Sequence, residues 1–207
     1  QVDGRGAEPP AAADATCTLD LLTDGAWSKR ADIACPGPDG LGLLALGDVG
    51  LPGELLTAST EQMIARCAAE PCHLISLAGD LMYVEGSNAE RAWDSIWDRT
   101  LWRLELPGLG VLGNHEYRHE PDPAGKRAAL YGADGRAGFV LPGPSWTMRV
   151  ARDGQALFAL VGLDTDSVAN PGSDMPGLGG AALQAGCALD VATVVVGVAA
   201  VIVHTCV

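Results

Sequence analysis

Short runs of apolar residues recur along the chain from Cys17 onward, separated by turns or by stretches with helical spacing. Most of the runs are about as long as a β-strand, and each is apolar at successive positions. Such a pattern is typical of strands that are covered on both faces of a sheet. The predicted strands are Leu41–Leu46, His73–Ala78, Leu109–Leu112, Ala156–Leu163 and Val191–Val203.

Two of the intervening stretches have the spacing of amphipathic helices. Residues 54–69 place Leu55, Leu56, Met63 and Ile64 among polar residues, and residues 88–104 place Trp93, Ile96, Trp97 and Leu101 three or four positions apart. Successive strand–helix–strand units predict an α/β fold, with a layered β-sheet flanked by helices. Residues 1–16 are rich in Pro, Ala, Gly and Asp and lack an apolar period, so we expect a flexible tail or linker before a domain at 17–207.

The apolar run near the end of the sequence, Val191–Val203, could in principle be a membrane segment. It has 13 residues, whereas a helix needs about 20 to cross a bilayer. We therefore expect no transmembrane span, and we predict that this run is one buried strand of the sheet.

Polar side chains follow four of the predicted strands, at the point where each strand ends. They are Asp48, Asp80, Asn114 and His204, and a glycine precedes each of the first three. Ligands of open parallel sheets bind beyond the carboxyl ends of the strands. Glycine also suits a tight turn in which the backbone approaches an ion. We therefore expect these residues to meet at one edge of the sheet.

Three short motifs carry a resemblance to a known family. Gly47-Asp48-Val49-Gly50, Gly79-Asp80-Leu81-Met82-Tyr83 and Gly113-Asn114-His115-Glu116 resemble the first three blocks of the calcineurin-like metallophosphoesterases. The tyrosine three residues after the second aspartate is similar to the purple acid phosphatase branch. Leu141–Trp146 and Leu160–Thr165 look like its small, tartrate-resistant form, so the resemblance runs from about Leu41 to Val207.

The resemblance implies a metallophosphoesterase-like β-sandwich with a dinuclear metal centre, Fe(III) paired with Fe, Zn or Mn. Asp80 would bridge the two ions, Asp48 and Tyr83 would hold the ferric ion, and Asn114 and His204 would hold the second. Two ions a few ångströms apart can clamp a phosphate monoester and supply a bridging hydroxide for in-line attack. His115 would stabilise charge on the phosphate and help to protonate the leaving alkoxide.

The sequence also departs from this family. The family closes its site with a Gly-His-x-His block, which these 207 residues do not contain, and Glu116 stands where the family usually has aspartate. A second alignment puts Val194–Gly197 on the last family strand and leaves Val198 at the position of the histidine. His204 is preferred because it is the only imidazole there. We therefore expect an incomplete domain that holds metal poorly and hydrolyses phosphate esters weakly.

Composition narrows the classes of partner and the compartment. The formal net charge of −13 argues against binding to nucleic acid, which requires a basic face. It does not exclude an anionic substrate, because a bound metal can reverse the local field.

Six cysteines in an acidic chain with only two lysines favour a secreted or extracytoplasmic protein. We expect at least one disulfide, with Cys67 and Cys72 as the nearest pair among 15 possible pairings.

Two function classes follow from these observations. The first is a secreted acid phosphatase, a phosphomonoester hydrolase that is impaired in this chain. The second is a non-catalytic module derived from a phosphatase and retained for binding or assembly. The sequence patterns do not specify the substrate, the second metal or the oligomeric state.

Overall fold

The computed structural model of the chain describes residues 16–37, 40–117, 122–164, 191–196 and 199–205. The predicted tail at 1–16 lies outside these residues except for Thr16, which begins the first strand. His119, Cys187 and Cys206 also lie outside them.

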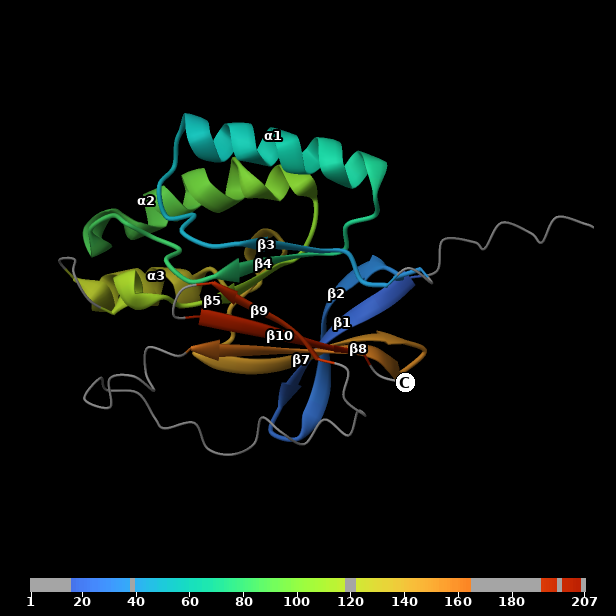
Figure 1. Ribbon diagram of the computed structural model, residues 1–207. Coiled ribbons are helices and arrows are strands. Elements are labelled where there is room, and N and C mark those ends of the chain that lie inside the picture. Colours follow the sequence, from blue (N-terminus) through green and yellow to red (C-terminus); the bar gives the residue numbers. More distant parts are fainter. Residues whose placement is uncertain (1–15, 38–39, 118–121, 165–190, 197–198, 206–207) are drawn as a thin grey trace, which may run out of the picture.

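A four-stranded parallel sheet forms the middle of the fold (Figure 1). Its strands lie side by side in the order of the sequence and are β3 (Leu43–Leu46), β4 (Leu74–Ala78), β5 (Gly108–Val111) and β6 (Phe139–Val140). Every residue of β4 and β5 is buried. The first three strands are those that the apolar runs predicted.

Helices connect these strands. Between β3 and β4 lies α1 (Glu54–Ala69), with the predicted bounds. The predicted helical stretch before β5 consists of a 3-10 turn (Gly86–Asn88), α2 (Ala89–Trp93), a π-helical turn (Asp94–Asp98) and a second 3-10 turn (Leu101–Leu104). Between β5 and β6 lie a 3-10 turn (Asn114–Glu116), α3 (Pro123–Gly132) and a last 3-10 turn (Arg136–Gly138).

A second, six-stranded sheet packs against the first. All of its neighbouring strands are antiparallel, in the order β2-β1-β7-β8-β10-β9. The strands are β1 (Thr16–Thr23), β2 (Ala26–Ala34), β7 (Ser145–Arg152), β8 (Gln155–Asp164), β9 (Val191–Val196) and β10 (Ala199–Thr205). The predicted run Ala156–Leu163 therefore belongs to this antiparallel sheet as part of β8.

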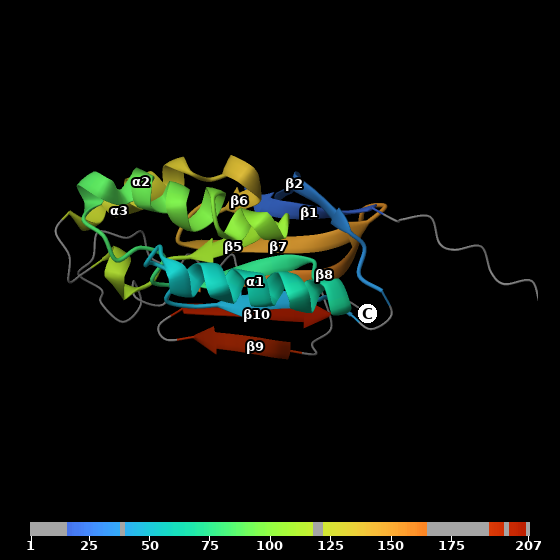
Figure 2. The same cartoon turned by 90° about the horizontal axis from the view of Figure 1, so that it is seen from above.

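The prediction of one strand over Val191–Val203 is wrong. The structure has two strands there, β9 and β10, which pair antiparallel with Val196 opposite Ala199. A single strand of 13 residues would be about twice the common length, and folding the run back lets each half make its own ladder of hydrogen bonds. Figure 2 shows β9 at the edge of the sheet, beyond β10.

Alternation along β4 creates two separate cores. Ile75 and Leu77 face the helices and pack with Trp93 and Trp97. Leu74 and Ala78 face the antiparallel sheet and belong to a second apolar cluster with Leu19, Leu109, Met148 and Leu160. Successive side chains of a strand point to opposite faces, so the parallel sheet is covered by helices on one side and by the second sheet on the other. This arrangement confirms the predicted layered α/β fold.

Among the residues that the structure describes, two disulfides link neighbouring segments. Cys67–Cys72, the pair nearest in sequence, joins the last turn of α1 to the segment before β4, and Cys17–Cys35 joins β1 to the end of β2. The prediction of at least one disulfide is confirmed. In the part of the chain that the structure describes, no helix combines the length and the apolarity needed to cross a membrane.

Candidate active site

Three loops meet at the carboxyl ends of neighbouring parallel strands. The first loop (residues 47–50) follows β3, the second loop (79–83) follows β4, and the third loop (113–116) follows β5. Backbone hydrogen bonds join the first two, because the Gly50 N–H donates to the Asp80 carbonyl (3.1 Å) and the Tyr83 N–H donates to the Gly50 carbonyl (3.0 Å). The fold thus fixes the spacing of the predicted site residues before any ligand binds.

The backbone turns sharply where the two aspartates stand. Asp48 and Asp80 adopt left-handed conformations, with φ of 55° and 51°, which aspartate tolerates better than most residues. Next to them, Gly113 packs so closely that a Cβ atom at this position would lie 2.3 Å from Asp80 Oδ1. The Gly-polar pairs in the sequence therefore reflect tight turns and close packing.

Three side chains with oxygen atoms, Asp48, Asp80 and Tyr83, converge between the first and second loops. The Tyr83 hydroxyl lies 2.5 Å from Asp48 Oδ1 and 3.2 Å from Asp80 Oδ2. Burial, the hydrogen bond to Asp48 and the two nearby carboxylate charges raise the pKa of the Tyr83 phenol above its usual range. In this structure the phenol therefore keeps its proton and shares it with the carboxylates.

His115 lies beside these donors. Its backbone N–H donates to Asp80 Oδ1 (3.1 Å), and its ring meets the Tyr83 ring edge to face, with centroids 4.4 Å apart. Asn114, the preceding residue, is half-buried at the start of the 3-10 turn. The structure thus brings Asp48, Asp80 and Tyr83 together, with His115 at their edge.

Two buried charged residues, Glu116 and Lys126, form hydrogen bonds to the backbone of the second and third loops. The Glu116 carboxylate accepts from the Met82 N–H (2.9 Å) and the Gly113 N–H (2.8 Å), while the Lys126 ammonium donates to the carbonyls of Met82 (3.2 Å) and His115 (3.0 Å). Both residues are fully buried. Burial raises the pKa of Glu116 to about 7, although its backbone donors and Lys126 favour the charged form. Sequence reasoning missed Lys126, and its only signal was the scarcity of lysine in the chain.

His204 comes from the other sheet. Its backbone lies in β10, opposite Ala159 of β8 and Val191 of β9, and β10 approaches β4 and β5. Its assignment as a metal ligand stays a prediction.

The donor set is rich in oxygen. Among the residues with described side chains, no three His, Cys, Asp or Glu residues form a group that could hold a metal ion. The three converging donors are two carboxylates and a phenol, and a hard cation such as Fe(III) prefers ligands of this kind. Two carboxylates and a phenol are therefore donors that suit a hard cation.

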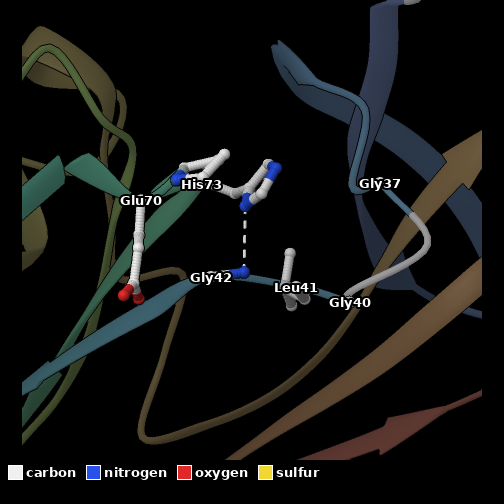
Figure 3. A pocket seen from close by; sticks show the side chains of 7 residues that line it. Gly37, Gly40, Leu41, Gly42, Glu70 and His73 are labelled. Atoms are coloured by element: carbon white, nitrogen blue, oxygen red, sulfur yellow. Dashed lines mark hydrogen bonds between the residues drawn. The ribbon is translucent and has the colours of Figure 1, made fainter. Parts of the chain in front are cut away.

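A separate hollow lies at the opposite end of the parallel sheet, where β3 and β4 begin. It has a volume of about 350 Å³ and is lined by Gly37, Gly40, Leu41, Gly42, Glu70, Pro71 and His73. His73 is buried, and its Nδ1 accepts from the Gly42 N–H at 2.9 Å (Figure 3). This bond uses the lone pair of a neutral imidazole, so His73 has a structural role in joining the segments before β3 and β4.

The His73 contact predicts a pH dependence of stability. Burial lowers the pKa of His73 below its ordinary 6.5, so its contribution to stability is complete above pH 6.5 and is lost as the pH falls below that value. We expect the free energy of unfolding to decline more steeply between pH 7.5 and 5.5 in the wild type than in His73→Gln, which cannot titrate. Urea unfolding across this range is the measurement, and parallel declines would contradict the prediction.

Comparisons with known proteins leave the family open. No protein family profile matches the chain, and no curated protein matches it. A solved structure described as "GAP50 the anchor in the inner membrane complex of Plasmodium" is similar, with 18% identity and a TM-score of 0.42. The match covers 57% of this chain and 39% of that one, so the chain spans well under half of its length. At this level of similarity the match assigns neither family nor function.

Proposed function

We propose that the chain is a metal-dependent phosphomonoester hydrolase of the purple acid phosphatase type, with low turnover. The observation that carries the proposal is the convergence of Asp48, Asp80 and Tyr83 at the carboxyl ends of adjacent parallel strands, with His115 beside them. Hard oxygen donors next to an imidazole suit a site that binds a cation and an anionic ester together.

A ferric ion would be held by Asp48, Asp80 and Tyr83, and a second ion (Fe, Zn or Mn) by Asp80, Asn114 and His204. The metal centre would supply electrophilic stabilisation of the phosphate and activation of the attacking water. The chain has a net charge of −13, and the site itself contains the carboxylates of Asp48 and Asp80. These negative charges would repel a phosphate ester, so a bound cation is needed to attract it.

The side chains of this site have separate tasks in the proposal. Asp80 is held by the His115 N–H, so its carboxylate is oriented before metal binding. Tyr83 would hold the cation as a phenolate and would lose its proton to solvent on binding, since metal ligands of this kind bind in the deprotonated form. His115 donates a proton toward the leaving alkoxide.

Low turnover follows from the ligands within the 207 residues. The second ion would have one shared carboxylate, one amide and one imidazole, and the family's Gly-His-x-His motif does not occur in the sequence. Changes in the surroundings of ligands alone cost about 10–100-fold in metal affinity, so missing ligands cost at least as much. We expect aryl phosphate hydrolysis far below the usual enzyme range of ~1–10³ s⁻¹.

An iron titration tests the proposal. Adding Fe(III) to the full chain should produce a visible charge-transfer band from the Tyr83 phenolate, and the band should weaken as the pH falls because binding displaces the phenol proton. Tyr83→Phe should lose the band, whereas Tyr131→Phe, on α3, should keep it. A titration without a band, or a band that survives in Tyr83→Phe, would overturn the proposed iron site.

A second candidate is a non-catalytic module retained for binding or assembly. The observation on its side is that the family's Gly-His-x-His motif does not occur in the sequence. Aryl phosphate hydrolysis separates the candidates: activity that rises on adding iron with zinc or manganese, and disappears in Tyr83→Phe, favours the enzyme. Iron binding with no hydrolysis under any metal condition favours the module.

For the compartment, we propose a secreted or extracytoplasmic protein. The two disulfides, Cys17–Cys35 and Cys67–Cys72, support this assignment because such bonds persist in oxidising surroundings.

A further inference from the structure

Both backbone polar groups of Met82 are held by buried charged side chains. Its N–H donates to Glu116 Oε1 (2.9 Å), and its carbonyl accepts from Lys126 Nζ (3.2 Å). Met82 stands directly before Tyr83 in the second loop. Glu116 and Lys126 thus fix the backbone of Met82, one through its N–H and the other through its carbonyl. The position of the neighbouring Tyr83 phenol therefore depends on both charged side chains.

The same two charges also hold the third loop. Glu116 Oε2 accepts from the Gly113 N–H (2.8 Å), and Lys126 Nζ donates to the His115 carbonyl (3.0 Å). Lys126 comes from α3, a separate element from both loops, and it is fully buried. Its ammonium thus bridges the residue before Tyr83 and the main chain of His115.

We propose that Lys126 is the positioning residue of this site. By bonding the second and third loops at once, it sets the separation of the Tyr83 phenol and the His115 imidazole, whose rings lie 4.4 Å apart. Its positive charge also offsets the nearby Glu116 carboxylate. The consequence for metal binding rests on the proposed function, whereas the consequence for loop order does not.

The chemistry of the contacts assigns a positioning role to Lys126 and not a catalytic one. Its two described hydrogen bonds go to main-chain carbonyls, which require an N–H donor, and its side chain is closed off from solvent. Lys126 therefore acts through the loops that it joins. A buried ammonium is costly unless it is hydrogen-bonded, so the two carbonyl contacts tie Lys126 to both loops.

The test compares two substitutions at one position with a control elsewhere. Lys126→Met keeps the unbranched apolar stem of the side chain and removes its N–H donors and its charge. Lys126→Gln keeps two N–H donors without the charge. Arg149→Met is the matched control, because it removes a largely buried cation that pairs with Asp20 (2.9 Å) in the antiparallel sheet.

The first readout is amide hydrogen exchange in the metal-free chain, which reports local opening. We expect Lys126→Met to accelerate exchange of the Met82, Tyr83, Gly113 and His115 amides more than elsewhere, and Lys126→Gln to give intermediate rates. Arg149→Met should leave these amides unchanged relative to the rest of the chain. Uniform acceleration, or none, would overturn the proposal.

The second readout is the Fe(III) titration of the same variants. Lys126→Met should lower the apparent iron affinity about tenfold or more, and Arg149→Met should leave it within twofold. Unchanged affinity with an unchanged band in Lys126→Met would overturn the proposal. If the wild type binds no iron, the proposed function fails, and the exchange readout still decides the role of Lys126. If Lys126→Met does not fold, Lys126→Gln carries both readouts.

Discussion

Replacing Asp80 by asparagine should weaken iron binding by about 100-fold or more and lower phosphate hydrolysis with it, while the chain stays folded. Asp80 contacts both Tyr83 and the His115 backbone, and it is the proposed bridge between the two ions. Asparagine tolerates the left-handed backbone at this position (φ 51°), so the turn survives. The amide carries no charge, so the proposed metal centre would lose the one carboxylate that both ions share.

We expect the iron affinity of Asp80→Asn to fall about 100-fold or more, beyond the range typical of residues that only support a ligand. Titration by the charge-transfer band is the measurement. The matched control is Asp153→Asn, an exposed aspartate with the same φ of 51° in the turn between β7 and β8. Equal affinities in Asp80→Asn and the wild type would contradict the assignment.

The second large effect is on stability. Glu116→Ala should lower the free energy of unfolding by about 2–4 kcal/mol, because it leaves the buried N–H groups of Met82 and Gly113 without their acceptor. Each orphaned donor costs about 1–3 kcal/mol, and the Lys126 ammonium loses a nearby opposite charge. Few single changes outside the apolar core would have an effect of this size.

Urea unfolding with the disulfides intact measures this loss. Glu90→Ala, an exposed glutamate on α2, is the control and should change stability by less than about 0.5 kcal/mol. A Glu116→Ala variant as stable as the control would mean that the two backbone donors find other partners.

The sequence predicted the parallel sheet well because its signals are local. Buried strands such as Leu74–Ala78 appear as continuous apolar runs, and the Gly-polar pairs mark where they end. The helix Glu54–Ala69 was equally easy to predict, because an acidic residue stands in its first turn and a basic residue in its last turn. These features decide where Asp48, Asp80 and Asn114 lie.

The antiparallel sheet was harder to predict. The hairpin of β1 and β2 turns at Asp24 and Gly25, both with positive φ. An Asp-Gly pair is a strong hairpin signal, but this one lies outside the long apolar runs. β2 is mostly exposed or half-buried, so it has no continuous apolar run to find.

The support of the site could not be predicted for a different reason. Lys126 contacts carbonyls 44 and 11 residues away in sequence, and backbone carbonyls leave no mark on residue type. Tyr83 and His115 were found through motifs, whereas their edge-to-face contact depends on how two loops fold together. Non-local bonds to the main chain are therefore the part of this site that sequence patterns do not encode.

Asp48, Asp80 and Tyr83 are proposed to form one metal site. Anomalous diffraction at the iron edge, from crystals of the full chain grown with Fe(III), tests it most directly. We predict an iron peak within bonding distance of the Asp48 and Asp80 carboxylates and the Tyr83 phenolate oxygen. An iron peak elsewhere on the chain, with the Tyr83 hydroxyl still hydrogen-bonded to Asp48, would contradict it.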